Sequence, residues 1–149
     1  AAIGYLITRN ATTAGAEGGC QAEVGSASAM AASAAVELFG GTPRQCMDAA
    51  SFAMVNILGL VCDPIGGLVE NPCQNRNAMG ASNALISAEL SLAGVKSITP
   101  IDETIGVMYA VGRSIPSELR ETSLGGMAVA KSACENCMSC ANKRNKMKK

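Results

Sequence analysis

The stretch GSASAMAASAAVELF, residues 25–39, decides the fold class of this 149-residue chain. Alanine has the highest intrinsic helix propensity, and the stretch is directly followed by Gly40 and Gly41, which can end a helix. Because its side chains are mostly small, neighbouring helices can approach it closely. The stretch therefore predicts a central, buried helix.

Further helices follow from capping and turn residues. Thr42-Pro43-Arg44-Gln45 is a capping box with proline at the first helical position, and predicts a helix that runs to about Leu60. No segment alternates apolar and polar residues with the period of a strand. We therefore predict an all-α fold of packed helices around the buried Ala/Gly-rich central helix. The remaining predicted elements are helices at about 1–9, 75–93 and 102–112, a shorter segment at 116–125, and turns at 62–67 and 71–73.

Composition excludes several classes of protein. The chain is 48% hydrophobic, 3% aromatic and 16% charged, which is too apolar for a disordered body, and no apolar run is long enough to cross a bilayer. It has no histidine, which excludes Ser-His-Asp and Cys-His nucleophiles and every zinc site that uses imidazole. Residues 1–130 carry a net charge of −5 and residues 131–149 a net charge of +5. We predict a folded part at 1–130 and a flexible basic tail at 131–149, with no nucleic-acid partner because no aromatic residue is interleaved to stack on bases.

Seven cysteines need a role. Cys46 lies in a predicted helix and is expected to be a buried small hydrophobe. Cys20, Cys62 and Cys73 each lie beside turn residues, where free backbone N–H groups lower the pKa of a thiol and can bond to cluster sulfurs. Their spacing alone leaves open three unrelated thiols. An odd cysteine count argues against a secreted disulfide framework and favours the cytoplasm.

The surroundings of these cysteines resemble a known family. The stretches AEGGCQAEVG (16–25), NILGLVCDP (56–64) and PCQNRNA (72–78), followed by LRETSLGGMA (119–128), resemble the iron–sulfur-dependent L-serine dehydratases in order and separation. The likeness runs from about residue 1 to about residue 130, and corresponds to the C-terminal part of the family's alpha chain or catalytic domain.

The resemblance implies a function and a cofactor. The family deaminates L-serine to pyruvate and ammonia without pyridoxal phosphate, using a 4Fe-4S cluster. Here the cluster ligands would be Cys20, Cys62 and Cys73, in turns at helix ends, and the fourth iron would stay open for substrate. An open iron can act as a Lewis acid on the serine hydroxyl, a poor leaving group, while a base removes the Cα proton.

The sequence identifies the catalytic base and the substrate-binding residues less clearly than the cluster ligands. The local candidates for the base are the side chains of Lys96, Glu17, Glu23, Asp63 and Glu121. Asp63 and Glu121 are rather expected to cap a helix or pair with arginine, and the base can also belong to a part of the family's domain outside this chain. Arg120 and Arg76 could grip the substrate carboxylate with their two-pronged guanidinium groups, or form ordinary salt bridges.

The tail holds a second cysteine group. Cys134, Cys137 and Cys140 have C-x2-C-x2-C spacing, which opens bacterial ferredoxin sites, but the fourth cysteine and its proline are absent. In single-chain members of the family a terminal cysteine can fold back onto the open iron, and Cys134 is nearest to that position. Cys137 and Cys140 would then bind adventitious metal or have no role. Two other functions stay open: a related cysteine desulfidase, and a metal-binding or electron-transfer module built on the tail cysteines.

The partners follow from the same resemblance. We expect L-serine as substrate, a beta domain or chain of the same enzyme, and no membrane. Residues 1–9 resemble the end of a helix whose start is absent, so we expect a fragment that folds only partly or that oligomerises through exposed apolar faces.

Overall fold

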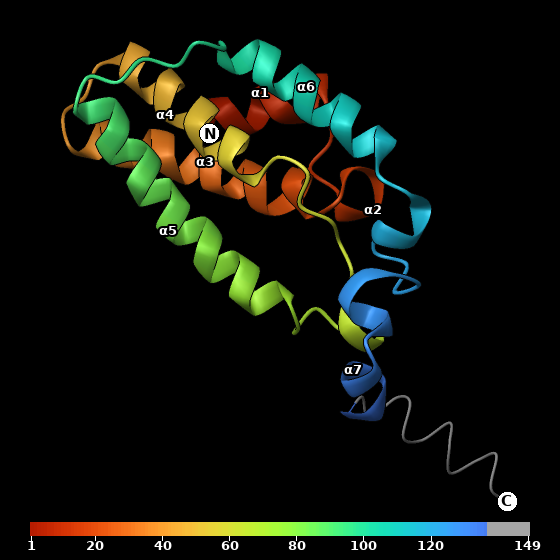
Figure 1. Ribbon diagram of the computed structural model, residues 1–149. Coiled ribbons are helices and arrows are strands. Elements are labelled where there is room, and N and C mark those ends of the chain that lie inside the picture. The colour runs from red at the N-terminus through yellow and green to blue at the C-terminus, as the bar shows by residue number, and fades with distance from the viewer. Residues whose placement is uncertain (137–149) are drawn as a thin grey trace, which may run out of the picture.

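The protein is helical throughout the part that its computed structural model describes, residues 1–136 without the side chains of Cys134 and Asn136 (Figure 1). Within these residues there is no strand, and one isolated parallel bridge joins Cys62 to Arg120. The predicted all-α class is confirmed. The α-helices are α1 (Ala2–Asn10), α2 (Gly15–Gly18), α3 (Cys20–Leu38), α4 (Pro43–Ile57), α5 (Cys73–Leu92), α6 (Ile101–Ser114) and α7 (Lys131–Asn136), and the 3-10 helices are η1 (Ile65–Gly67), η2 (Ser117–Leu119) and η3 (Gly126–Val129).

Helix α3 contacts α1, α2, α4, α5 and α6. It starts at Cys20, five residues before the start expected at Gly25. The helix continues through Gly25 because this residue packs against α4, where a Cβ atom would lie 3.8 Å from Ile57 Cγ2, an ordinary packing distance. The break lies instead at Gly19, whose φ of 76° is not helical.

Helix α4 begins as predicted. The Thr42 hydroxyl accepts a hydrogen bond from the Gln45 amide at 3.3 Å, and the Gln45 side-chain oxygen accepts one from the Thr42 amide at 2.9 Å. This is the reciprocal capping box. The helix ends at Ile57, three residues before the predicted end. Its inner face is buried at Ala49, Ala50, Ala53 and Ile57, whereas Cys46, which was expected to be buried, is only half-buried near the start of the helix.

Helix α5 starts at Cys73, two residues earlier than expected, and packs against both α3 and α4. Buried polar bonds fix its register. The Asn83 amide nitrogen donates to the Ser28 hydroxyl of α3 at 2.9 Å and to the Ala53 carbonyl of α4 at 2.8 Å. Helices α3, α4 and α5 are therefore held in one arrangement at their centre.

After α6 the chain returns to the end of the molecule where α5 begins. Figure 1 shows the blue segment that contains η3 and α7 beside the yellow-green segment that contains η1. None of the helices within residues 1–136 is long and apolar enough to span a membrane. Cys137, Cys140 and the basic run at 143–149 lie outside the described residues.

Candidate metal centre

The structure brings Cys20, Cys62 and Cys73 to one end of the helix bundle. Cys20 is the first residue of α3, Cys73 is the first residue of α5, and Cys62 lies in the loop after α4. All three are free thiols and are buried, with exposed fractions of 2%, 4% and 8% in the order 20, 62 and 73. The Cys20 and Cys62 side chains are hydrogen-bonded to each other, and Cys73 lies near both, since the charge of Cys20 raises the pKa of Cys73 and the charge of Cys73 raises the pKa of Cys62.

Two glycines before Cys20 allow the backbone to approach its neighbours. At Gly19 a Cβ atom would lie 2.7 Å from the Leu60 carbonyl oxygen and 2.9 Å from Ile115 Cδ1, distances that side chains do not tolerate. The Cα of Gly18 would likewise be only 2.7 Å from a Cβ at Gly112 of α6. The Gly18-Gly19 pair therefore lets the start of α3 lie directly against the chain that leads to Cys62.

Gln21 joins the start of α3 to α6 and to the loop after α4. Its buried side chain donates to the Met108 carbonyl of α6 at 2.9 Å and accepts from the Gly59 amide at 2.8 Å. Its own amide donates to the Leu60 carbonyl at 2.9 Å. The sequence alone does not point to Gln21, because an uncharged glutamine inside a helix carries no signal of a long-range role.

The segment around Cys62 is paired with the chain after α6. The Cys62 amide donates to the Leu119 carbonyl at 2.8 Å, and the Glu121 amide donates to the Cys62 carbonyl at 2.7 Å. Cys62 is also packed against α2, since a Cβ at Gly15 would lie 3.2 Å from its sulfur. Backbone bonds thus place the LRETSLGGMA stretch beside the cysteines.

Asp63 and Arg76 form a buried ion pair next to Cys20. Arg76 Nη1 lies 2.5 Å from Asp63 Oδ1, 2.8 Å from the Val61 carbonyl oxygen and 3.9 Å from the Cys20 sulfur. The other Asp63 oxygen accepts from the Met127 amide at 2.6 Å. Pairing of Asp63 with an arginine was one of the roles expected from the sequence. The structure places Arg76 in this network, bonded to a carboxylate of the chain itself.

The three thiols differ in the direction in which their surroundings shift their pKa values. The hydrogen bond from Cys62, assisted by Arg76, lowers the pKa of Cys20 to about 7 although burial opposes this. The same bond raises the pKa of Cys62, and burial raises it further. Burial, followed by the nearby charge of Cys20, raises the pKa of Cys73. The thiolate is the form that binds metal, and the positive charge of Arg76 favours the thiolate of Cys20.

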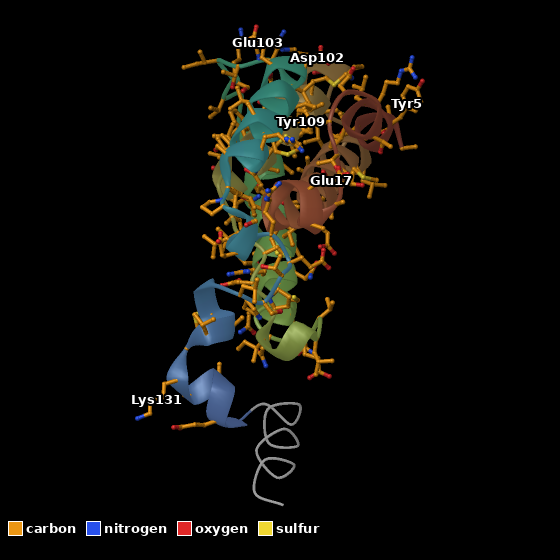
Figure 2. All side chains as sticks on the ribbon, turned by 90° about the vertical axis from the view of Figure 1, so that its right-hand side faces the viewer. Tyr5, Glu17, Asp102, Glu103, Tyr109 and Lys131 are labelled. Carbon is orange, nitrogen blue, oxygen red and sulfur yellow. The ribbon has the colours of Figure 1, made fainter. Side chains whose placement is uncertain are left out.

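The residues expected as a base are spread over the molecule. Glu23 lies near Cys20 and Cys73 and is exposed, and Glu121 lies near Cys62, since the charges of both carboxylates act on these thiols. Glu17 lies on α2 (Figure 2), with an exposed side chain. Lys96 follows the C-terminal end of α5, a helix of 20 residues and therefore about 30 Å long, whose first residue is Cys73. Asp63 is engaged by the bonds described above.

Arg120 lies between the segments that carry Cys20 and Cys62. Its Nη1 donates to the Glu17 carbonyl at 3.3 Å, three residues before Cys20, and its backbone forms the bridge to Cys62. Its buried Nε has no hydrogen-bond partner among residues 1–136. The ion pairs Arg44–Asp48 and Arg76–Asp63 of the described residues do not involve Arg120.

The chemistry of the donor set is that of iron–sulfur ligands. Three buried free thiols lie at one end of the bundle, and buried thiols without imidazole are the ligands that such clusters use. As arranged here, no three His, Cys, Asp or Glu residues in the described part of the chain surround a single metal ion. The side chain of Cys134 lies outside the described residues, as do Cys137 and Cys140, so its role as a fourth ligand stays a prediction.

Comparison with known proteins identifies the family. The chain belongs to the serine dehydratase alpha chain family, which it matches over residues 1–128. It is 58% identical over 127 residues to the probable L-serine dehydratase alpha chain of Bacillus subtilis, a match of 85% of this chain and 42% of that protein. It is 61% identical over 129 residues to the L-serine dehydratase alpha chain of Peptoniphilus asaccharolyticus, a match that covers 87% of this chain and 44% of that protein. It is 48% identical over 129 residues to the L-serine dehydratase of Helicobacter pylori, a match that covers 86% of this chain and 28% of that protein. The chain thus spans less than half the length of each of these three relatives.

Proposed function

We propose that this chain forms the cluster-binding part of an iron–sulfur L-serine dehydratase, which converts L-serine to pyruvate and ammonia without pyridoxal phosphate. One observation carries the proposal: the three cysteines that stand 42 and 11 residues apart in the sequence meet as buried free thiols at the end of the bundle. Family membership and the names of the relatives support serine as the substrate.

The thiolates of Cys20, Cys62 and Cys73 would hold a 4Fe-4S cluster. When bound, the cluster supplies an iron with an open coordination position, a Lewis acid for the departing hydroxide of serine. Three cysteines are the number of protein ligands that leaves one iron of such a cluster open. Burial of the three sulfurs supports this role, since a cluster is protected by exclusion of solvent.

Arg120 would bind the carboxylate of L-serine. A guanidinium group matches a carboxylate with two parallel hydrogen bonds, and the buried Nε of Arg120 lacks a partner among the described residues. Arg76 is less suited to this task, because its Nη1 is already bonded to Asp63.

Of the described carboxylates beside the cysteines, Asp63 is engaged by Arg76 and the Met127 amide, which leaves Glu23 and Glu121. In the reaction, the Cα proton of serine passes to a carboxylate oxygen and the β-hydroxyl leaves as hydroxide, which gives aminoacrylate. Aminoacrylate then becomes the imine by moving a proton to its methylene carbon, and water hydrolyses the imine to pyruvate and ammonia. Both side chains are exposed, and Glu23, which lies near two of the three cysteines, Cys20 and Cys73, is the better placed of the two.

The partners and the compartment follow from the same proposal. The alpha-chain names of two relatives support a beta chain as partner. Large exposed apolar side chains, including Leu38, Phe39 and Ile98, support further association, either with that chain or between copies. The free thiols suit the reducing cytoplasm.

The test is anaerobic reconstitution with iron and sulfide, followed by absorption spectroscopy with each enantiomer of serine. We expect a thiolate-to-iron charge-transfer spectrum that shifts with L-serine and does not shift with D-serine. In Arg120→Lys the spectrum without serine should be unchanged, while the L-serine concentration needed for the shift should rise roughly tenfold. A cluster that responds equally to both enantiomers, or to neither, would argue against a substrate site on this chain.

A further inference from the structure

The ion pair of Asp63 and Arg76 connects several separate segments of the site. Arg76 belongs to the first turn of α5, next to Cys73, and reaches the Cys20 sulfur and the Val61 carbonyl. Asp63 is adjacent to Cys62 and reaches the Met127 amide in η3. The pair therefore touches the segments of all three cysteines and the closing segment 119–128.

Asp63 faces a donor on each of its two oxygens. Arg76 donates to Oδ1 and the Met127 amide donates to Oδ2, and the side chain is only 3% exposed. An asparagine in this place would present one oxygen and one NH2 group, so one of the two donors would face another donor. Buried donors left without an acceptor are costly, and this arrangement needs a carboxylate.

The glycine before Met127 shows how closely the closing segment approaches Asp63. Gly126 has a φ of 61°, and a Cβ atom there would overlap the Asp63 carboxylate. Ser123 adds a second connection, since its hydroxyl donates to the Pro64 carbonyl at 2.6 Å. The closing segment is thus fitted onto the loop that carries Cys62 and Asp63.

We propose that Asp63 and Arg76 are a positioning pair, which holds the three cysteine segments and the closing segment 119–128 together before any metal binds and donates a hydrogen bond to the Cys20 sulfur afterwards. The second part rests on the proposed function, and the first does not. Under this proposal Arg76 organises the ligands, and Arg120 is left as the arginine that meets substrate.

The first test is hydrogen exchange of the metal-free chain, read by mass spectrometry over residues 119–128. Asp63→Asn should speed exchange in this segment roughly tenfold, and Gly126→Ala should do the same without a change of charge. Arg44→Lys is the matched control, because Arg44 also pairs with an aspartate, Asp48, but on α4 and with a largely exposed side chain. The control should leave exchange in 119–128 unchanged.

The second test uses the reconstituted protein and measures iron per chain and the reduction potential. Arg76→Lys keeps the charge but cannot serve three acceptors with the same geometry, so iron content should fall by half or more. The cluster that remains should have a lower potential, because hydrogen bonds to cluster sulfurs raise it. Arg44→Lys should match the wild type in both.

The outcomes separate the two proposals. If the unmodified chain takes up no cluster, the proposed function fails, and exchange over 119–128 still decides whether the pair positions these segments. If the chain takes up a cluster while Asp63→Asn and Gly126→Ala exchange like the wild type, the positioning proposal is wrong. It is also wrong if Arg76→Lys destabilises the chain but leaves the potential of its cluster unchanged, since the pair would then be merely structural.

Discussion

Replacing Gly19 by alanine tests the packing that sets Cys20 beside Cys62. Gly19 has φ 76° and ψ 177°, a backbone region that only glycine occupies readily, and strain there costs roughly 1–3 kcal/mol. The added Cβ would lie 2.7 Å from the Leu60 carbonyl oxygen, so that carbonyl must move. It accepts the Gln21 amide at 2.9 Å, and loss of this bond adds about 0.5–1.5 kcal/mol. We expect Gly19→Ala to lower the free energy of unfolding by about 2–4 kcal/mol.

Gly40→Ala is the matched control for this experiment. Gly40 also has a positive φ, 78°, but a Cβ atom there would meet nothing within 4 Å. Gly40→Ala should therefore lower the free energy of unfolding only by the cost of placing alanine at a positive φ, roughly 1–2 kcal/mol. Both variants are compared with the wild type by urea unfolding, followed by helix circular dichroism, and by iron per chain after reconstitution. The reasoning is refuted if Gly19→Ala is no more destabilising than Gly40→Ala, or if it retains the full iron content.

Three further substitutions probe separate parts of the account. Gln21→Leu removes the bonds to the Met108 carbonyl and the Gly59 amide and should lower the free energy of unfolding by about 2–3 kcal/mol in urea titrations. A loss no larger than that of an exposed substitution would contradict the role of Gln21 as the link between α3, α6 and the loop after α4. Thr42→Ala removes the capping box of α4 and should cost about 1 kcal/mol while iron per chain stays at the wild-type level, so a loss of iron would show that α4 and the cysteines are coupled more strongly than described. Arg120→Lys should raise the KM of the complete enzyme for L-serine roughly tenfold with unchanged iron, and an unchanged KM would remove Arg120 from the substrate site.

The helices could largely be predicted from the sequence because their determinants are local. The capping box at Thr42 and the alanine-rich stretch before Gly40 act within a few residues, and both predicted their helices. The starts of α3 and α5 were placed too late. Neither helix has a side-chain N-cap, and their first residues are cysteines, so the boundary depends on the packing of Gly19 and of the preceding loop.

The surroundings of each cysteine could be predicted, but their proximity could not. Each of the three cysteines lies beside a helix end or a loop, in line with the neighbouring turn residues, but no spacing rule brings residues 42 and 11 positions apart together. Gln21 and Arg76 act over separations of 87 and 56 residues, on partners that the sequence does not identify. The guanidinium of Arg76 could equally have met substrate or carboxylate, and only the fold decides that Asp63 is its neighbour.

The most direct test of the account is the count of iron and sulfide per chain after anaerobic reconstitution of a set of cysteine variants. The wild type should hold about four of each, in line with a 4Fe-4S cluster. Alanine at Cys20, Cys62 or Cys73 should each abolish the cluster. Alanine at Cys46, a half-buried thiol on α4, and the triple replacement of Cys134, Cys137 and Cys140 should each preserve it. A cluster that survives loss of Cys20, Cys62 and Cys73 together, or disappears with the three tail cysteines, would contradict the account.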